Sequence, residues 1–119
     1  MYADQFESRL ARVRHRFATT LEGKITNAVV KADHMSRSVD GVMQVSESYR
    51  NLHGICGIGP TVGFTATGEA AHVAEAALIQ AYRESRGLTE REVVSLRKAL
   101  QNLEVAAASE LRSMYQRGG

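Results

Sequence analysis

Residues 5–35 read QFESRLARVRHRFATTLEGKITNAVVKADHM, and the spacing of their apolar side chains decides the fold class. These side chains recur at steps of three and four residues, which is the repeat of one face of an α-helix. They are Phe6, Leu10, Val13, Phe17, Leu21, Ile25 and Ala28. The stretch therefore predicts one long helix, or two helices broken near Gly23.

Three later stretches carry the same helical period. The second helix follows a loop at residues 36–41, and Thr65 or Thr67 is placed to cap the third. Thr89 and Glu92 have the spacing of a capping box at the start of the fourth helix. The apolar positions are Val42, Val45, Tyr49, Leu52 and Cys56, then Ala70, Val73, Ala74, Ala77, Leu78 and Ala81, then Val93, Leu96, Leu100, Leu103, Ala107, Leu111 and Met114.

These helices predict an all-α fold. Each one has a single apolar stripe, so it must bury that stripe against a neighbour to be stable. The connections are short, which makes consecutive helices antiparallel, and alternating β-type runs are absent. We expect an antiparallel up-and-down four-helix bundle that forms one domain over residues 1–119, with or without an additional N-terminal helix segment.

Composition narrows the class of protein. Lys and Arg number 15 and Asp and Glu 13, a balance that does not favour nucleic acid as a partner. The one cysteine, Cys56, excludes an internal disulfide and is typical of a reducing compartment. We find no signal peptide and no apolar run of the roughly 20 residues that a membrane span needs. These features predict a cytoplasmic protein without a membrane partner.

Residues 53–64, HGICGIGPTVGF, interrupt the helical pattern with four glycines and the only proline. Inside a helix glycine costs about 1 kcal/mol relative to alanine, and proline about 3 kcal/mol. His53 falls on a polar face, where Gly57 removes the side chain that would stand against the imidazole and Gly54 bares the backbone. An accessible imidazole with no thiol, carboxylate pair or hydroxyl–base pair predicted around it favours covalent acceptance of a phosphoryl group.

This segment resembles the active-site helix of histidine-containing phosphotransfer domains, which act in two-component phosphorelays. The matching residues are His53, Ile55, Gly57 and Gly63 followed by Phe64, and then GEAAHVAEAAL at residues 68–78, with Glu75 at the acidic position of the family's next helix. The resemblance extends in pattern from Phe6 to Leu111, but its specific part is Leu52 to Leu78.

The resemblance implies a four-helix bundle in which His53 accepts phosphoryl from the aspartate of a response-regulator receiver domain and passes it to another. It implies that Gly54 and Gly57 permit close docking and that Arg50 offsets charge on the phosphoimidazole. Such a chain is a phosphocarrier without an ATP site, not an enzyme. It would bind no cofactor or metal of its own, Mg²⁺ being supplied by the receiver, and a hybrid histidine kinase is a further possible partner.

The sequence departs from the family at two positions and allows a second alignment. Cys56 stands where the family often has lysine, and Pro60 falls where the family stays helical, so we expect a kink or a tighter turn. In the second alignment Arg50 takes the place of the histidine, at the cost of a three-residue insertion before Gly63. The chain would then be a pseudo-phosphotransfer module that docks a receiver or a kinase without carrying phosphate.

The remaining candidate residues are predicted to be structural or solvent-exposed rather than parts of a functional site. His72 is expected to be a solvated residue and not a metal ligand, and Cys56 a small core residue rather than a redox thiol. Arg9, Arg12 and Arg16 share one helix face, which we expect to be solvated. The functional alternatives for that face are a docking patch for an acidic receiver and, less favoured, a nucleic-acid or scaffold surface.

Overall fold

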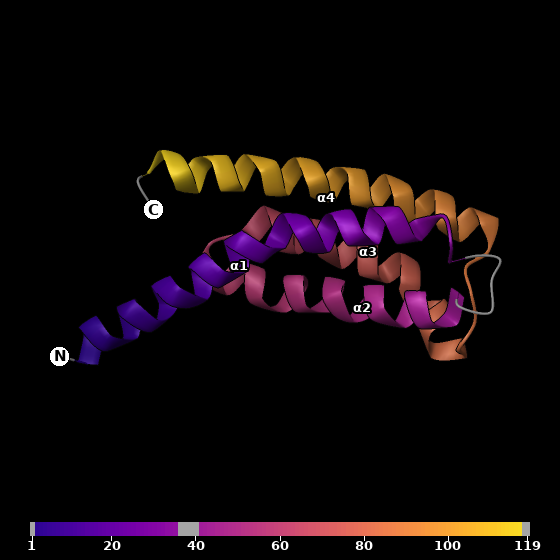
Figure 1. Ribbon diagram of the computed structural model, residues 1–119, viewed down its shortest axis with the longest axis horizontal. Helices are drawn as coiled ribbons and strands as arrows, with labels where there is room; N and C mark the ends of the chain where they lie inside the picture. The colour runs from indigo at the N-terminus through magenta and orange to yellow at the C-terminus, as the bar shows by residue number, and fades with distance from the viewer. Residues whose placement is uncertain (1, 36–40, 118–119) are drawn as a thin grey trace.

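The computed structural model describes residues 2–35 and 41–117, and within them the chain folds into four long helices without strands. Successive helices run in opposite directions, so the predicted all-α, antiparallel four-helix bundle is confirmed (Figure 1). A short 3₁₀ turn, η1, joins the second helix to the third. The elements are α1 Tyr2–Ala32, α2 Gly41–Ile58, η1 Gly59–Val62, α3 Thr65–Glu84 and α4 Glu90–Gln116.

The core lies between one apolar stripe from each helix. α3 packs against both α2 and α4, while α1 packs mainly against α4. Leu21, Leu52, Leu78 and Leu103 are each almost fully buried and come from the four different helices. None of the helices described is both long and apolar enough to cross a membrane.

α1 is one continuous helix that passes through Gly23 without a break. With 31 residues it is about 46 Å long, against about 27 Å for the 18 residues of α2. Its N-terminal part therefore extends beyond the other helices (Figure 1). Phe6 is 67% exposed and Val13 46% exposed for this reason, so placing them in the buried stripe was wrong.

Two valines at other predicted core positions are also exposed. Val42 is 40% exposed in the first turn of α2, at the edge of the helix pair. Val73 is 57% exposed, because the buried face of α3 is formed by Ala71, Ala74 and Leu78 and turns Val73 to the opposite side.

The N-terminus of α3 is capped from α4 rather than by a local threonine. The helix begins at Thr65, and Phe64, at the cap position, makes no side-chain cap. The Glu110 carboxylate instead accepts from the backbone N–H of Ala66 at 3.3 Å and of Thr67 at 2.7 Å, and from the Thr67 hydroxyl at 2.6 Å. The predicted caps were wrong, because a carboxylate distant in sequence satisfies these donors and complements the helix dipole.

The predicted capping box at the start of α4 is confirmed. The Thr89 hydroxyl accepts from the Glu92 N–H, and the Glu92 carboxylate accepts from the Thr89 N–H. Arg86 donates to both carboxylate oxygens of Glu92, at 2.7 and 3.1 Å. This ion pair, aided by the Thr89 hydrogen bonds, lowers the pKa of Glu92 to about 2.

Candidate functional site

His53 stands on α2 with its side chain 66% exposed, as the sequence predicted. Its Nδ1 lies 3.2 and 3.3 Å from the two carboxylate oxygens of Glu75 on α3. The Glu75 side chain is only 9% exposed. The site therefore combines an exposed imidazole with a buried carboxylate from the neighbouring helix.

This pairing decides which nitrogen of His53 is available for chemistry. An ionised carboxylate can only accept a hydrogen bond, so the proton of a neutral imidazole belongs on Nδ1, facing Glu75. Nε2 then carries the lone pair, on the ring edge away from the carboxylate. The geometry provides an oriented, solvent-accessible nucleophile.

Tyr49, one turn before His53, forms a platform under the imidazole that sequence reasoning missed. The two rings are stacked, with centroids 5.7 Å apart and planes 12° apart. Tyr49 also stacks with Tyr82 of α3, and the centroids of these two rings are 4.2 Å apart. A tyrosine four residues before the histidine was the available signal, because helical side chains lean toward the helix N-terminus.

Gly54 and Gly57 leave open backbone beside His53. Apart from the adjacent residues and the backbone of α2 itself, a Cβ built at either position would meet no described heavy atom within 4 Å. The expectation that a side chain at Gly57 would stand against the imidazole is therefore wrong, because His53 leans toward Tyr49 and away from Gly57. Among the described residues neither glycine is needed for packing, so both leave backbone exposed at the surface.

The remaining helix breakers serve the turn between α2 and α3. The helix tightens into η1 at Pro60, which confirms the expected distortion. A Cβ on Gly59 would lie 3.0 Å from the Phe64 carbonyl oxygen, and one on Gly68 would lie 2.8 Å from the Pro60 ring. Gly63 closes the turn with a left-handed φ of 91°. Glycine is required at these positions for close approach and for positive φ.

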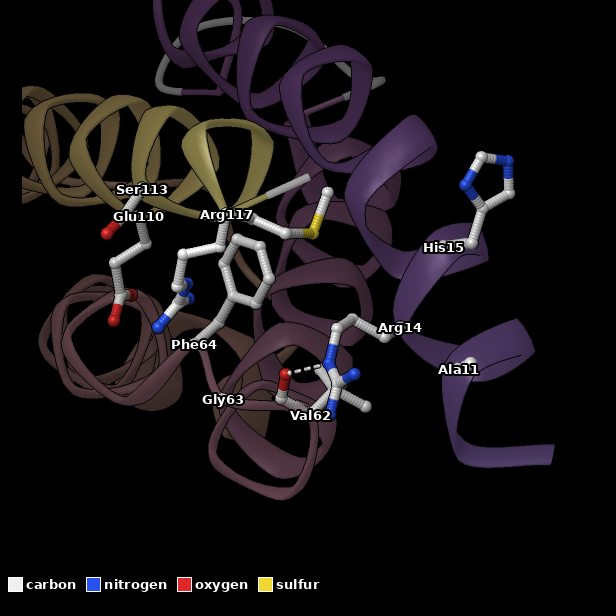
Figure 2. Close-up of a pocket in the computed structure, with 10 residues that line it drawn as sticks. Ala11, Arg14, His15, Val62, Gly63, Phe64, Glu110, Ser113 and Arg117 are labelled. Carbon is white, nitrogen blue, oxygen red and sulfur yellow. Dashed lines mark hydrogen bonds between the residues drawn. The ribbon is translucent and has the colours of Figure 1, made fainter. Parts of the chain in front are cut away.

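A separate pocket lies at the end of the bundle where α1, η1 and α4 meet, with a volume of about 620 Å³. Arg14 donates from Nε to the Val62 carbonyl oxygen at 2.9 Å and so fastens η1 to α1, while the His15 ring points outward (Figure 2). Neither His53 nor Glu75 lines this pocket. Arg14 therefore supports the turn after α2 rather than His53 itself.

Arg50 is exposed on α2, one turn before His53. Lys31 lowers the pKa of Glu47 by hydrogen bond and charge, and the positive charge of Arg50 adds a smaller lowering. Arg50 therefore interacts electrostatically with Glu47. Its assignment as a charge-offsetting residue stays a prediction, as does the alignment that puts Arg50 in place of the histidine.

Cys56 and His72 meet across the α2–α3 interface, which sequence reasoning missed. The thiol Sγ lies 3.8 Å from His72 Nδ1, and ligand atoms of Cys56, His72 and Glu75 all lie within 4.8 Å of one another. Burial raises the pKa of the Cys56 thiol, and the Glu75 charge raises it further. A thiol held in its protonated form is a poor redox nucleophile.

A signal for this cluster was present in the sequence. His53 and Cys56 are three residues apart on one helix, as are His72 and Glu75 on the next. Such pairs on facing antiparallel helices converge, as in metal-binding helical bundles. His72 is exposed, as expected, but it is a contact residue rather than a merely solvated one.

Comparison with known proteins adds no relative: the chain matches no protein-family model, no curated protein and no solved structure. The arginines proposed as a docking face, Arg9, Arg12 and Arg16, are exposed on α1. The structure shows an all-α four-helix bundle in which an exposed histidine on α2, His53, is paired with the carboxylate of Glu75.

Proposed function

We propose that this chain is a cytoplasmic phosphorelay intermediate of the histidine-containing phosphotransfer type. His53 would accept a phosphoryl group from the aspartate of a receiver domain and pass it to another receiver. The observation that supports this most is the pairing of an exposed imidazole with a buried carboxylate, which leaves Nε2 as the reactive nitrogen. The resemblance of residues 52–78 to the family's site supports it independently.

In the proposed reaction the Nε2 lone pair of His53 attacks phosphorus of the receiver's acyl phosphate. A P–N bond forms and the P–O bond to the aspartate breaks, so the carboxylate leaves with the bonding electron pair. The imidazole keeps its proton on Nδ1 and becomes cationic. The Glu75 carboxylate, within 3.3 Å of Nδ1, is placed to stabilise this charge, and transfer to the next aspartate reverses the step.

The partner would complete the site. Phosphoryl transfer needs in-line approach and positive charge on the phosphoryl oxygens. The receiver would bring Mg²⁺ in its acidic pocket, and the open backbone at Gly54 and Gly57 would let its loops approach His53. Arg50 would add positive charge one turn away.

The test is phosphate uptake from a phosphorylated receiver domain, measured as acid-labile phosphate on the chain. His53→Gln removes the nucleophile but keeps a polar side chain on an exposed position, so uptake should vanish while the fold and receiver binding persist. His15→Gln, another exposed histidine, is the matched control and should retain uptake. Uptake by His53→Gln would refute the proposal.

Glu75→Gln tests the positioning role within the same assay. The Gln amide can still accept a hydrogen bond from Nδ1 but carries no charge, and losing about 1.5 kcal/mol of charge-assisted stabilisation should slow transfer about tenfold. Receiver affinity should stay unchanged, because Glu75 is buried beneath the histidine. A change in affinity with an unaltered transfer rate would contradict this role.

Two outcomes would support other functions. Receiver binding by the wild-type chain without phosphate uptake would favour the docking module aligned through Arg50. Stable, salt-sensitive binding to random DNA without receiver binding would favour the nucleic-acid alternative on the Arg9–Arg16 face.

A further inference from the structure

We propose that Cys56, His72 and Glu75 form a zinc-binding site directly beside His53. These residues offer a thiol sulfur, an imidazole nitrogen and a carboxylate oxygen, the three ligand types that Zn²⁺ takes in proteins. They come from two helices that pack along their length, so the site is built on rigid elements.

The distances fit a tetrahedral ion. With Zn–S of about 2.3 Å and Zn–N of about 2.0 Å, the sulfur and nitrogen ligands of one tetrahedral zinc lie about 3.5 Å apart. The Cys56 Sγ to His72 Nδ1 distance is 3.8 Å. All three ligand atoms lie within 4.8 Å, so side-chain adjustments of about 1 Å bring the carboxylate into range as well.

The donor set selects the class of ion. Mg²⁺ and Ca²⁺ prefer oxygen ligands, whereas a thiolate with an imidazole favours zinc. On binding, the Cys56 thiol releases its proton to solvent and the sulfur electron pair coordinates the ion. Three protein ligands leave a fourth position for water. His72 is exposed and Cys56 half-buried, so the ion can enter from solvent.

Zinc at this site would act on His53 through Glu75, which both sites share. The carboxylate that lies 3.2 Å from His53 Nδ1 is also a member of the metal-binding set. A bound cation would draw the Glu75 carboxylate away from the His53 imidazole. It would also place positive charge beside the positive charge that develops on this imidazole during transfer. We infer that zinc slows phosphoryl uptake by His53, an inference that rests on the proposed function.

Binding is tested first, without any receiver, by calorimetric titration of the full chain with Zn²⁺ under reducing conditions. One ion should bind per chain, and Cys56→Ala and His72→Gln should each weaken binding by at least about tenfold. His15→Gln is the matched control and should bind like the wild type. Co²⁺ should give a thiolate charge-transfer band that Cys56→Ala lacks. The proposed zinc site would be refuted if the wild type bound no Zn²⁺, or if the wild type and the three variants all bound it equally.

The regulatory step is tested by phosphate uptake at matched free zinc. Zinc should slow uptake by the wild type more than uptake by His72→Gln, each compared with itself without zinc. Equal slowing of both would place the inhibition on the receiver and refute the effect through Glu75. Failure of the wild type to take up phosphate without zinc would refute the proposed function, while the titration would still decide the zinc site.

Discussion

Gly57→Ala and Gly68→Ala, both in helices beside the site, should change stability in opposite directions. A Cβ at Gly57 meets open space, so the better helix propensity of alanine should stabilise the fold by about 0.5–1 kcal/mol. A Cβ at Gly68 would lie 2.8 Å from Pro60 Cδ, against about 3.5–4.0 Å for a normal carbon contact. Overpacking against a rigid ring costs about 1–3 kcal/mol, which should outweigh the gain.

The difference between the two variants, about 2 kcal/mol, is measurable by urea or thermal unfolding. Each kcal/mol should shift the melting temperature by about 4 °C in a chain of this size. Phosphate uptake supplies a second readout: Gly57→Ala should be slower despite its greater stability, because its methyl group intrudes on the docking surface. A destabilised Gly57→Ala, or a stabilised Gly68→Ala, would refute the reasoning that Gly57 leaves open surface while Gly68 is needed for close packing against Pro60.

Two other predictions concern distant carboxylates. Glu110→Ala should destabilise the fold by about 2 kcal/mol in urea unfolding, because it uncaps α3 and leaves the buried Thr67 hydroxyl without its acceptor. The control is Glu104→Ala, whose side chain is exposed on α4 and whose loss should change stability by less than about 0.5 kcal/mol. Glu92, with its pKa lowered from 4.5 to about 2 chiefly by Arg86, should contribute about 1–2 kcal/mol above pH 5 after allowance for solvent screening, and lose this as the pH falls toward 2. The stability gap between wild type and Glu92→Gln should therefore shrink on acidification; a gap that is constant from pH 7 to about 2.5 would contradict the ion pair.

The helices were predictable because their signals are local. Apolar spacing placed α4 almost completely, and the capping box at Thr89 and Glu92 fixed its start. The errors at Phe6 and Val13 arose because spacing shows which face is apolar but not where the neighbouring helices end. The cap on α3 failed for a related reason, since Glu110 lies more than forty residues away.

The site was predictable only in part. The exposure of His53 followed from its position on the polar face of its helix, and the open space at Gly57 followed from its lack of a side chain. The orientation of the imidazole did not follow, because it depends on the lean of the side chain toward Tyr49 and on a carboxylate from another helix. Those contacts require the axial register of α2 against α3, which helical periodicity leaves open.

Three contacts between α3 and the segment formed by α2 and η1 agree on one register. Pro60 faces Gly68, Cys56 faces His72 and His53 faces Glu75, so each step back along α2 is matched by an equal step forward along α3. A slip of one turn, about 5.4 Å, would separate the histidine from its carboxylate and the thiol from its imidazole together. The close approach at Gly68, where no side chain fits, is the contact nearest the turn and resists such a slip. Pro60 and Gly68 therefore hold the two facing residue pairs in place.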